Sequence, residues 1–245
     1  MLTLQPVNRY WFSFEGGNHM KKIGLAIVAV LLAAVALPAA LANGGRPASG
    51  SPRVDRAPQL TPRQKAINHY NRGLKNRDKA WKHEEKARQA SAQKKRQKEL
   101  EKAQKQYTRA IKEFRSAVEL VDNFHQAYGS LGYALRRSGQ YEEALQSYDR
   151  SLAIHPGYVE AIEYRAEAYL GLNRLEDAKS AYLLLVRQDQ EQAGKLLEAM
   201  KDWIGQRRED QSVEAGSLDE FAQWVAERDG IAQTTARPTA SWGSW

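Results

Sequence analysis

The side chains that most often carry chemistry are scattered along this sequence. Its 245 residues include five histidines and no cysteine, which excludes disulfides, thiolate metal sites and a cysteine nucleophile. His69, His83, His125 and His155 show neither the HExxH spacing of zinc enzymes nor any other ligand spacing. No nucleophile elbow and no glycine-rich phosphate loop occurs either. We therefore predict no catalytic residues, no metal site and no cofactor.

Charge, in contrast, is strongly organised. Residues 63–116 carry 18 Lys or Arg against 6 Asp or Glu, whereas residues 117–230 carry 12 against 21. The run KKRQKELEKAQK could bind an anionic polymer, lipid headgroups or an acidic protein face. Alternatively, it is a solvated helical face with pairs such as Glu101 and Lys105. The candidates for an anionic-surface site are Lys94, Lys95, Arg96, Lys98 and Lys102.

An apolar segment near the start has the pattern of an export signal. The residues MKK at 20–22 precede IGLAIVAVLLAAVAL, and small residues follow at Ala40 and Ala42. We predict that residues 20–42 are a signal peptide and that the mature protein lies in the periplasm without a lipid. The alternative is an uncleaved membrane anchor.

Residues 1–19 do not fit this pattern, because signals start at the N-terminus. The stretch EGGNHM, back-translated, contains a bacterial ribosome-binding sequence just before an ATG codon. We therefore expect residues 1–19 to be a mis-called extension. No nucleic-acid partner is expected, because an exported protein rarely meets one and no aromatic residue lies between Trp81 and Tyr107 in the basic run.

The rest of the chain is predicted to be helical. Residues 43–60 are rich in Gly, Pro and Ser and should form a flexible linker. Thr61-Pro62 then provides a helix start. Apolar residues recur at steps of three and four to about Met200. No two-residue alternation typical of strands appears, so we predict an all-α body.

A period of 34 residues runs through this body. The repeating positions are a small and an aromatic residue: Ala110, Ala144 and Ala178, and Phe114, Tyr148 and Tyr182. Such a period is the signature of a stacked repeat. The residues Tyr128, Leu131, Gly132, Leu135, Gly139, Tyr141, Ala144, Tyr148 and Pro156 have the spacing of the tetratricopeptide repeat. The chain thus resembles the tetratricopeptide family, in an exported bacterial form, which implies an α-solenoid of antiparallel helix pairs.

The resemblance divides the chain into a repeat at 125–158, a degenerate repeat at 159–192 and capping helices at 193–230. A disordered tail is expected at 231–245. Residues 61–124 depart from the family. There, helices over about 62–89 and 92–121 are predicted to form a long basic hairpin ending in a partial repeat, whose first helix would fall in SAQKKRQKELEKAQ. The far end is polar all round and would project into solvent or meet a partner. A single very long helix is the alternative.

In this family the first helix of each repeat lines a concave groove that takes a segment of a partner protein. The resemblance implies these groove residues: Gln126, Tyr133, Arg136, Arg137, Glu160, Glu163, Glu167 and Leu170. They suit a segment of mixed charge with one apolar anchor, although each is also compatible with an ordinary solvent-facing position. We predict a non-enzymatic periplasmic scaffold that binds another protein, of the cell envelope, in this groove. The alternative function is binding of an anionic polymer or membrane surface through the hairpin.

Overall fold

The computed structural model describes residues 59–210 and 213–236, and every regular element within these ranges is an α-helix. The helices are α2 (Pro62–Arg88), α3 (Gln93–Leu120), α4 (His125–Arg137), α5 (Tyr141–Ile154), α6 (Val159–Gly171), α7 (Leu175–Gln188), α8 (Gln190–Asp210) and α9 (Ala215–Ala236). The prediction of an all-α fold is confirmed. The predicted extension, the signal peptide, most of the linker and the end of the tail lie outside the described residues. None of the described helices is both long and apolar enough to span a membrane.

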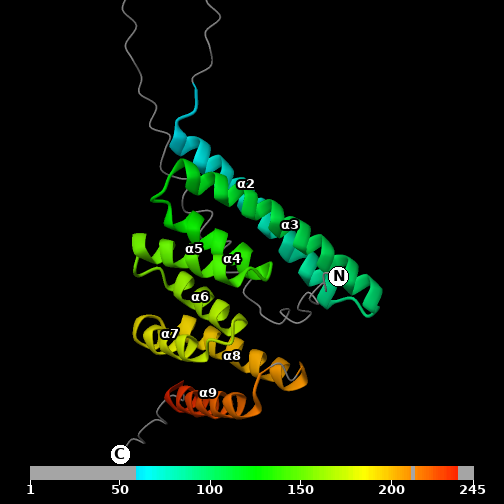
Figure 1. Ribbon diagram of the computed structural model, residues 1–245, viewed down its shortest axis with the longest axis vertical. Helices are drawn as coiled ribbons and strands as arrows, with labels where there is room; N and C mark the ends of the chain where they lie inside the picture. The colour runs from blue at the N-terminus through cyan, green and yellow to red at the C-terminus, as the bar shows by residue number, and fades with distance from the viewer. Residues whose placement is uncertain (1–58, 211–212, 237–245) are drawn as a thin grey trace, which may run out of the picture. The chain divides into compact units, whose positions relative to one another are not determined.

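Successive helices form antiparallel pairs that follow one another in chain order (Figure 1). α2 packs along α3, α4 on α5, α6 on α7, and α8 on α9. The first helices of neighbouring pairs also touch, α2 with α4, α4 with α6 and α6 with α8. We call α2, α4, α6 and α8 the A helices, and α3, α5, α7 and α9 the B helices. The prediction of a tetratricopeptide-like stack with a long first hairpin is confirmed.

A glycine on the A helix and an aromatic ring on the B helix meet inside each of the first two pairs. A Cβ atom added to Gly132 would lie 2.7 Å from Tyr148 Cε1, and one added to Gly73 would lie 2.4 Å from Phe114 Cε1. These distances leave room for glycine alone, which lets the two helices approach closely. Gly139, with a φ of +77°, makes the left-handed turn between α4 and α5.

The Gly73–Phe114 contact shows that α2 and α3 form a complete repeat, which corrects the sequence analysis. The expected first helix, SAQKKRQKELEKAQ at 91–104, belongs mostly to the start of α3 instead. Phe114 lies 34 residues before Tyr148, but Gly73 lies 59 residues before Gly132, so the first pair is longer by 25 residues. This insertion puts α2 out of phase with the period and concealed it.

The inserted residues lengthen α2 and α3 into a two-helix arm. By this register, Asp78 corresponds to Arg137 at the end of α4, and Tyr107 corresponds to Tyr141 at the start of α5. We therefore define the arm as residues 79–106. The chain reverses between α2 and α3, so the hairpin prediction is confirmed and the single long helix is not formed.

The arm has a buried stripe of its own, contrary to expectation. Ala87, Ala90 and Ala103 are at most 3% exposed, and Glu99 is buried beside them, where it bonds to Lys102 and to His83 Nδ1. Alanine contributes little to an apolar pattern in the sequence. It nevertheless allows two helices to pack closely, so the arm needs no large apolar residue at its tip.

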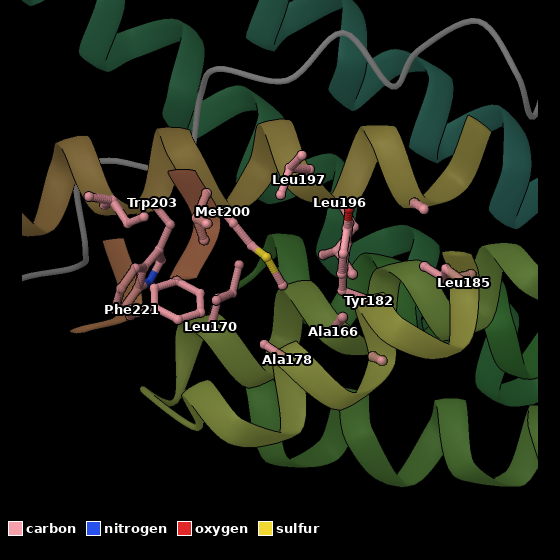
Figure 2. Packing of buried hydrophobic residues seen from close by; sticks show 14 of the residues in the cluster. Ala166, Leu170, Ala178, Tyr182, Leu185, Leu196, Leu197, Met200, Trp203 and Phe221 are labelled. Carbon is pink, nitrogen blue, oxygen red and sulfur yellow. The ribbon is translucent and has the colours of Figure 1, made fainter. Parts of the chain in front are cut away.

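The C-terminal part of the chain shares one hydrophobic core that runs from α6 to α9 (Figure 2). Its largest buried members include Leu170, Leu185, Leu196, Met200, Trp203 and Phe221. The helices predicted for residues 193–230 are present as α8 and α9. However, α9 continues through Gly230 to Ala236, so the first part of the predicted disordered tail is helical.

Candidate partner-binding site

The eight predicted groove residues lie on α4 and α6, and most of them are buried. Tyr133, Arg136, Glu163, Glu167 and Leu170 are at most 7% exposed. Leu170 belongs to the core of Figure 2, so it does not offer a partner the apolar anchor that the sequence analysis expected. Its side chain is drawn inward because α8 and α9 continue the core beyond α6. Gln126 and Glu160 keep partly exposed side chains, and Arg137 is 10% exposed.

A buried ion pair joins α4 to α6. Arg136 Nη1 lies 2.5 Å from Glu167 Oε2, and both side chains are 4% exposed. The guanidinium also lies 5.3 Å and 5.4 Å from the ring centroids of Tyr133 and Tyr164. Burial alone would lower the pKa of Arg136, but the Glu167 carboxylate outweighs it and the pKa is raised. Arg136 is therefore a fixed positive charge inside the protein.

Glu163, one turn before Glu167 on α6, has no cation of this kind. Its side chain is 1% exposed, and its Oε1 atom has no hydrogen-bond partner among the described residues. Burial first, and then the charge of Glu167, raises the pKa of Glu163 well above its usual value. Lys195 of α8 opposes this shift, but it bonds to Glu191 at 2.8 Å. Glu163 therefore favours its protonated form.

α2 is joined to α4 by similar contacts. Trp81 Nε1 donates a hydrogen bond to Tyr133 Oη at 2.7 Å, and Arg137 Nη2 donates one to Glu84 Oε1 at 2.6 Å. Arg77 stacks on Trp81, with Cζ 4.2 Å from the ring centroid. Sequence reasoning did not assign Arg77, Trp81 or Glu84 to the site. Aligning Gly73 with Gly132 would have found the first of them, because Arg77 then corresponds to Arg136.

These contacts leave hydrogen-bonding capacity unused at the A helices. Arg136 Nε, Glu163 Oε1 and Glu167 Oε1 are all buried without a hydrogen-bond partner in the part of the chain that the structure describes. Leaving a buried polar atom unsatisfied costs about 1–3 kcal/mol. We call Arg136, Glu163 and Glu167 the A-helix charge cluster.

The predicted anionic-surface residues lie on the arm. Lys94, Lys95, Arg96 and Lys98 are exposed at the start of α3, whose first turn has no acidic residue and whose N-cap, Ala92, makes no side-chain hydrogen bond. These cations therefore oppose the helix dipole. Lys102 lies one turn further on. Its hydrogen bond, together with that of His83, holds the pKa of Glu99 at about 2.

No group of three or more His, Asp or Glu residues is arranged to hold a metal ion in the described ranges. Stacked antiparallel helix pairs with laterally bonded A helices define an α-solenoid repeat protein. Residues 96–159 and 135–200 match two family models, each described as tetratricopeptide repeat. The chain is a tetratricopeptide repeat-containing protein. Such repeats typically mediate protein–protein interaction and are generally non-enzymatic, and no catalytic family matches the chain.

Among solved structures, the chain is similar to the Sgt2 TPR domain from Aspergillus fumigatus. Identity is 16%, the match covers 75% of this chain and 91% of that chain, and the TM-score is 0.39. It is also similar to the MamA RS-1 ArsTM double mutant, with 19% identity, 69% and 97% coverage, and a TM-score of 0.36. No curated protein sequence matches the chain.

Proposed function

We propose that this protein is a non-enzymatic scaffold of the bacterial periplasm that binds a segment of an envelope protein along the A helices. The A-helix charge cluster carries this proposal. Two carboxyl groups and one guanidinium are buried there, and each has a polar atom without a hydrogen-bond partner among the described residues. A partner segment at this surface would bring donors and acceptors that the described chain does not supply.

The stack does not need such a cluster for stability. Replacing a buried ion pair by apolar residues of similar volume is often neutral or stabilising by about 1–4 kcal/mol. The third helix pair has such an apolar interior around Met200 and Trp203. Charged residues between α4 and α6 are thus better explained by recognition than by folding.

The accessible residues beside the cluster indicate the chemistry of the partner. Gln126 opens α4 and Glu160 opens α6, and both side chains are partly exposed. Counted with Glu163 and Glu167, the predicted groove has three glutamates and two arginines. One of those arginines, Arg137, is bonded to Glu84. We therefore favour a partner segment that presents a basic side chain toward α6.

The periplasmic location is supported by the sequence alone. Residues 20–42 combine a short cationic start, an apolar run and small residues at a cleavage site. Fractionation of cells that express a C-terminally tagged copy tests the location. A processed product in the periplasmic fraction is expected, and a cytoplasmic pool would contradict the proposal.

Capture of the partner from the native envelope tests the binding surface. We expect the double substitution Gln126→Arg and Glu160→Arg to lower recovery of the partner. The matched control places the same two changes on α5, as Gln146→Arg and Glu142→Arg, where both side chains are exposed. Equal losses in the two variants would show that added charge, rather than the A-helix surface, determines binding.

A further inference from the structure

One face of α2 carries a nearly continuous line of cations. Its positions, at alternating steps of three and four residues, are Lys65, Asn68, Arg72, Lys75, Lys79, Lys82 and Lys86, and all are exposed. We call this set the α2 stripe. Six of its members lie two positions after a buried residue, from Ala66 to Glu84. Two positions correspond to about 200° of helical rotation, so the stripe faces away from the core.

Little in the described part of the chain neutralises the α2 stripe. Arg72 bonds to Glu113 at 2.9 Å. No ion pair with another described residue involves the five lysines: Lys65, Lys75, Lys79, Lys82 and Lys86. Like charges three or four residues apart on a helix repel one another, by about 0.2–0.5 kcal/mol per pair. The stripe therefore weakens α2 unless something outside the chain binds it.

α3 carries a second line of exposed cations. It consists of Lys94, Lys98, Lys105, Arg109 and Lys112. Glu101 is the acid beside this line, and Gln97 donates a hydrogen bond to it at 3.4 Å. The first helix pair thus presents cations along both helices rather than at the tip of the arm alone.

The spacing of the α2 stripe indicates the form of its partner. Cations three or four residues apart on a helix stand about 5 Å from one another, and the stripe from Lys65 to Lys86 is about 30 Å long. A line one cation wide matches a linear chain with evenly spaced negative groups. A membrane surface or the acidic face of another protein would be matched better by a broad patch.

We propose that the first helix pair binds a linear anionic polymer, of the acidic polysaccharide class, along the α2 stripe. This function adds to partner binding at the A helices and does not depend on it. Several cations engage the polymer at once, so its bound counterions are released together and the affinity falls steeply with added salt. In the envelope, such a contact would hold the scaffold on the polymer while the A helices bind a protein.

Binding of polygalacturonate, which has one carboxylate per sugar, to the purified protein tests the proposal, with neutral dextran as the control polymer. We expect binding at low salt that weakens progressively with added NaCl. The triple substitution Lys75→Glu, Lys79→Glu and Lys82→Glu should weaken it by at least about tenfold. Circular dichroism should show that the variant keeps its helices, since all three side chains are exposed.

A matched control reverses three exposed arginines outside the first helix pair: Arg150→Glu, Arg187→Glu and Arg208→Glu. It changes the net charge equally, so we expect less than about a threefold effect on polymer binding. Equal weakening by both variants would overturn the α2 stripe as the site. Trigalacturonate binding as tightly as the polymer would overturn the linear arrangement. Binding to phosphatidylglycerol vesicles without binding to the polymer would show that a membrane is the partner instead.

Discussion

Phe114 lies against Gly73 so closely that a single added carbon on the glycine would fall 2.4 Å from the ring. Gly132 and Tyr148 repeat this relationship in the next helix pair, at 2.7 Å. The contact therefore fixes the register of the first pair, which the 34-residue period alone does not. It also marks residues 79–106 as an addition to a complete repeat.

Substituting Gly73→Ala should destabilise the protein. Phe114 is fully buried, so its ring cannot move aside without disturbing the core, and such overpacking costs about 1–3 kcal/mol. The free energy of unfolding in urea measures the effect. Gly194→Ala is the control, because no atom lies within 4 Å of its added Cβ. Gly194 is exposed within α8, so this change should stabilise by about 0.5–1 kcal/mol. A neutral Gly73→Ala would remove the basis of the register.

Substituting Arg136→Met should cost about 3–5 kcal/mol, because Glu167 would be left buried without its cation. The double variant Arg136→Met with Glu167→Met should recover most of that loss, since no unpaired charge remains. The exposed pair of Arg165 and Asp149, at 2.6 Å, provides the comparison, and Asp149→Asn should cost no more than about 1 kcal/mol. Thermal or urea unfolding of the four proteins gives the values. A double variant as unstable as Arg136→Met would contradict the account.

Glu163→Gln should change the pH dependence of stability. A glutamate whose folded pKa lies above its unfolded pKa stabilises the fold at pH values below the unfolded value, about 4.3. That contribution is lost as the pH rises toward the raised folded pKa of Glu163. We expect the variant to match the wild type near pH 4 and to be more stable at pH 8, by at least about 1 kcal/mol. Unfolding free energies across this range decide it, and a constant difference would contradict the raised pKa.

His125 should contribute a pH dependence of the opposite sign. Its ring stacks on His155 with centroids 4.8 Å apart, and burial first, then the charge of His155, lowers the pKa of His125. A histidine with a lowered folded pKa stabilises the fold above its unfolded value, about 6.5, and that stability is lost as the pH falls through the folded pKa. We expect His125→Phe to reduce the loss of stability between pH 7 and pH 5. An unchanged slope would show that the histidine pair does not titrate with folding.

The sequence predicted those parts of the fold that a local pattern or a fixed period encodes. Gly139 gave the turn between α4 and α5, and the aromatic residues Phe114 and Tyr148 gave the period. Gly73 was missed because the insertion lies between it and the next glycine of the pattern. The end of α9 was misjudged at Gly230, where one glycine costs a helix only about 1 kcal/mol. Pro238 is the stronger stop, because Arg237 before it disfavours the helical region.

The candidate site was less predictable, because burial depends on the neighbouring helices. Arg136 and Glu167 were identified correctly as residues that share a surface, yet their ion pair across α4 and α6 could not be inferred from either repeat alone. Leu170 was assigned to a groove by its position in the repeat. The degenerate repeat that contains it is followed by α8 and α9, which bury it.

Photo-crosslinking in the native cell tests the central claim, that the A helices bind a segment of a protein partner. A photoreactive amino acid would replace Gln126 or Glu160 on the A helices, and Gln146 or Glu142 on α5 in the matched controls. The account predicts that both A-helix positions crosslink to one segment of the same envelope protein, as identified by mass spectrometry, and that the α5 positions do not. Crosslinks to that protein from the α5 positions alone would contradict it.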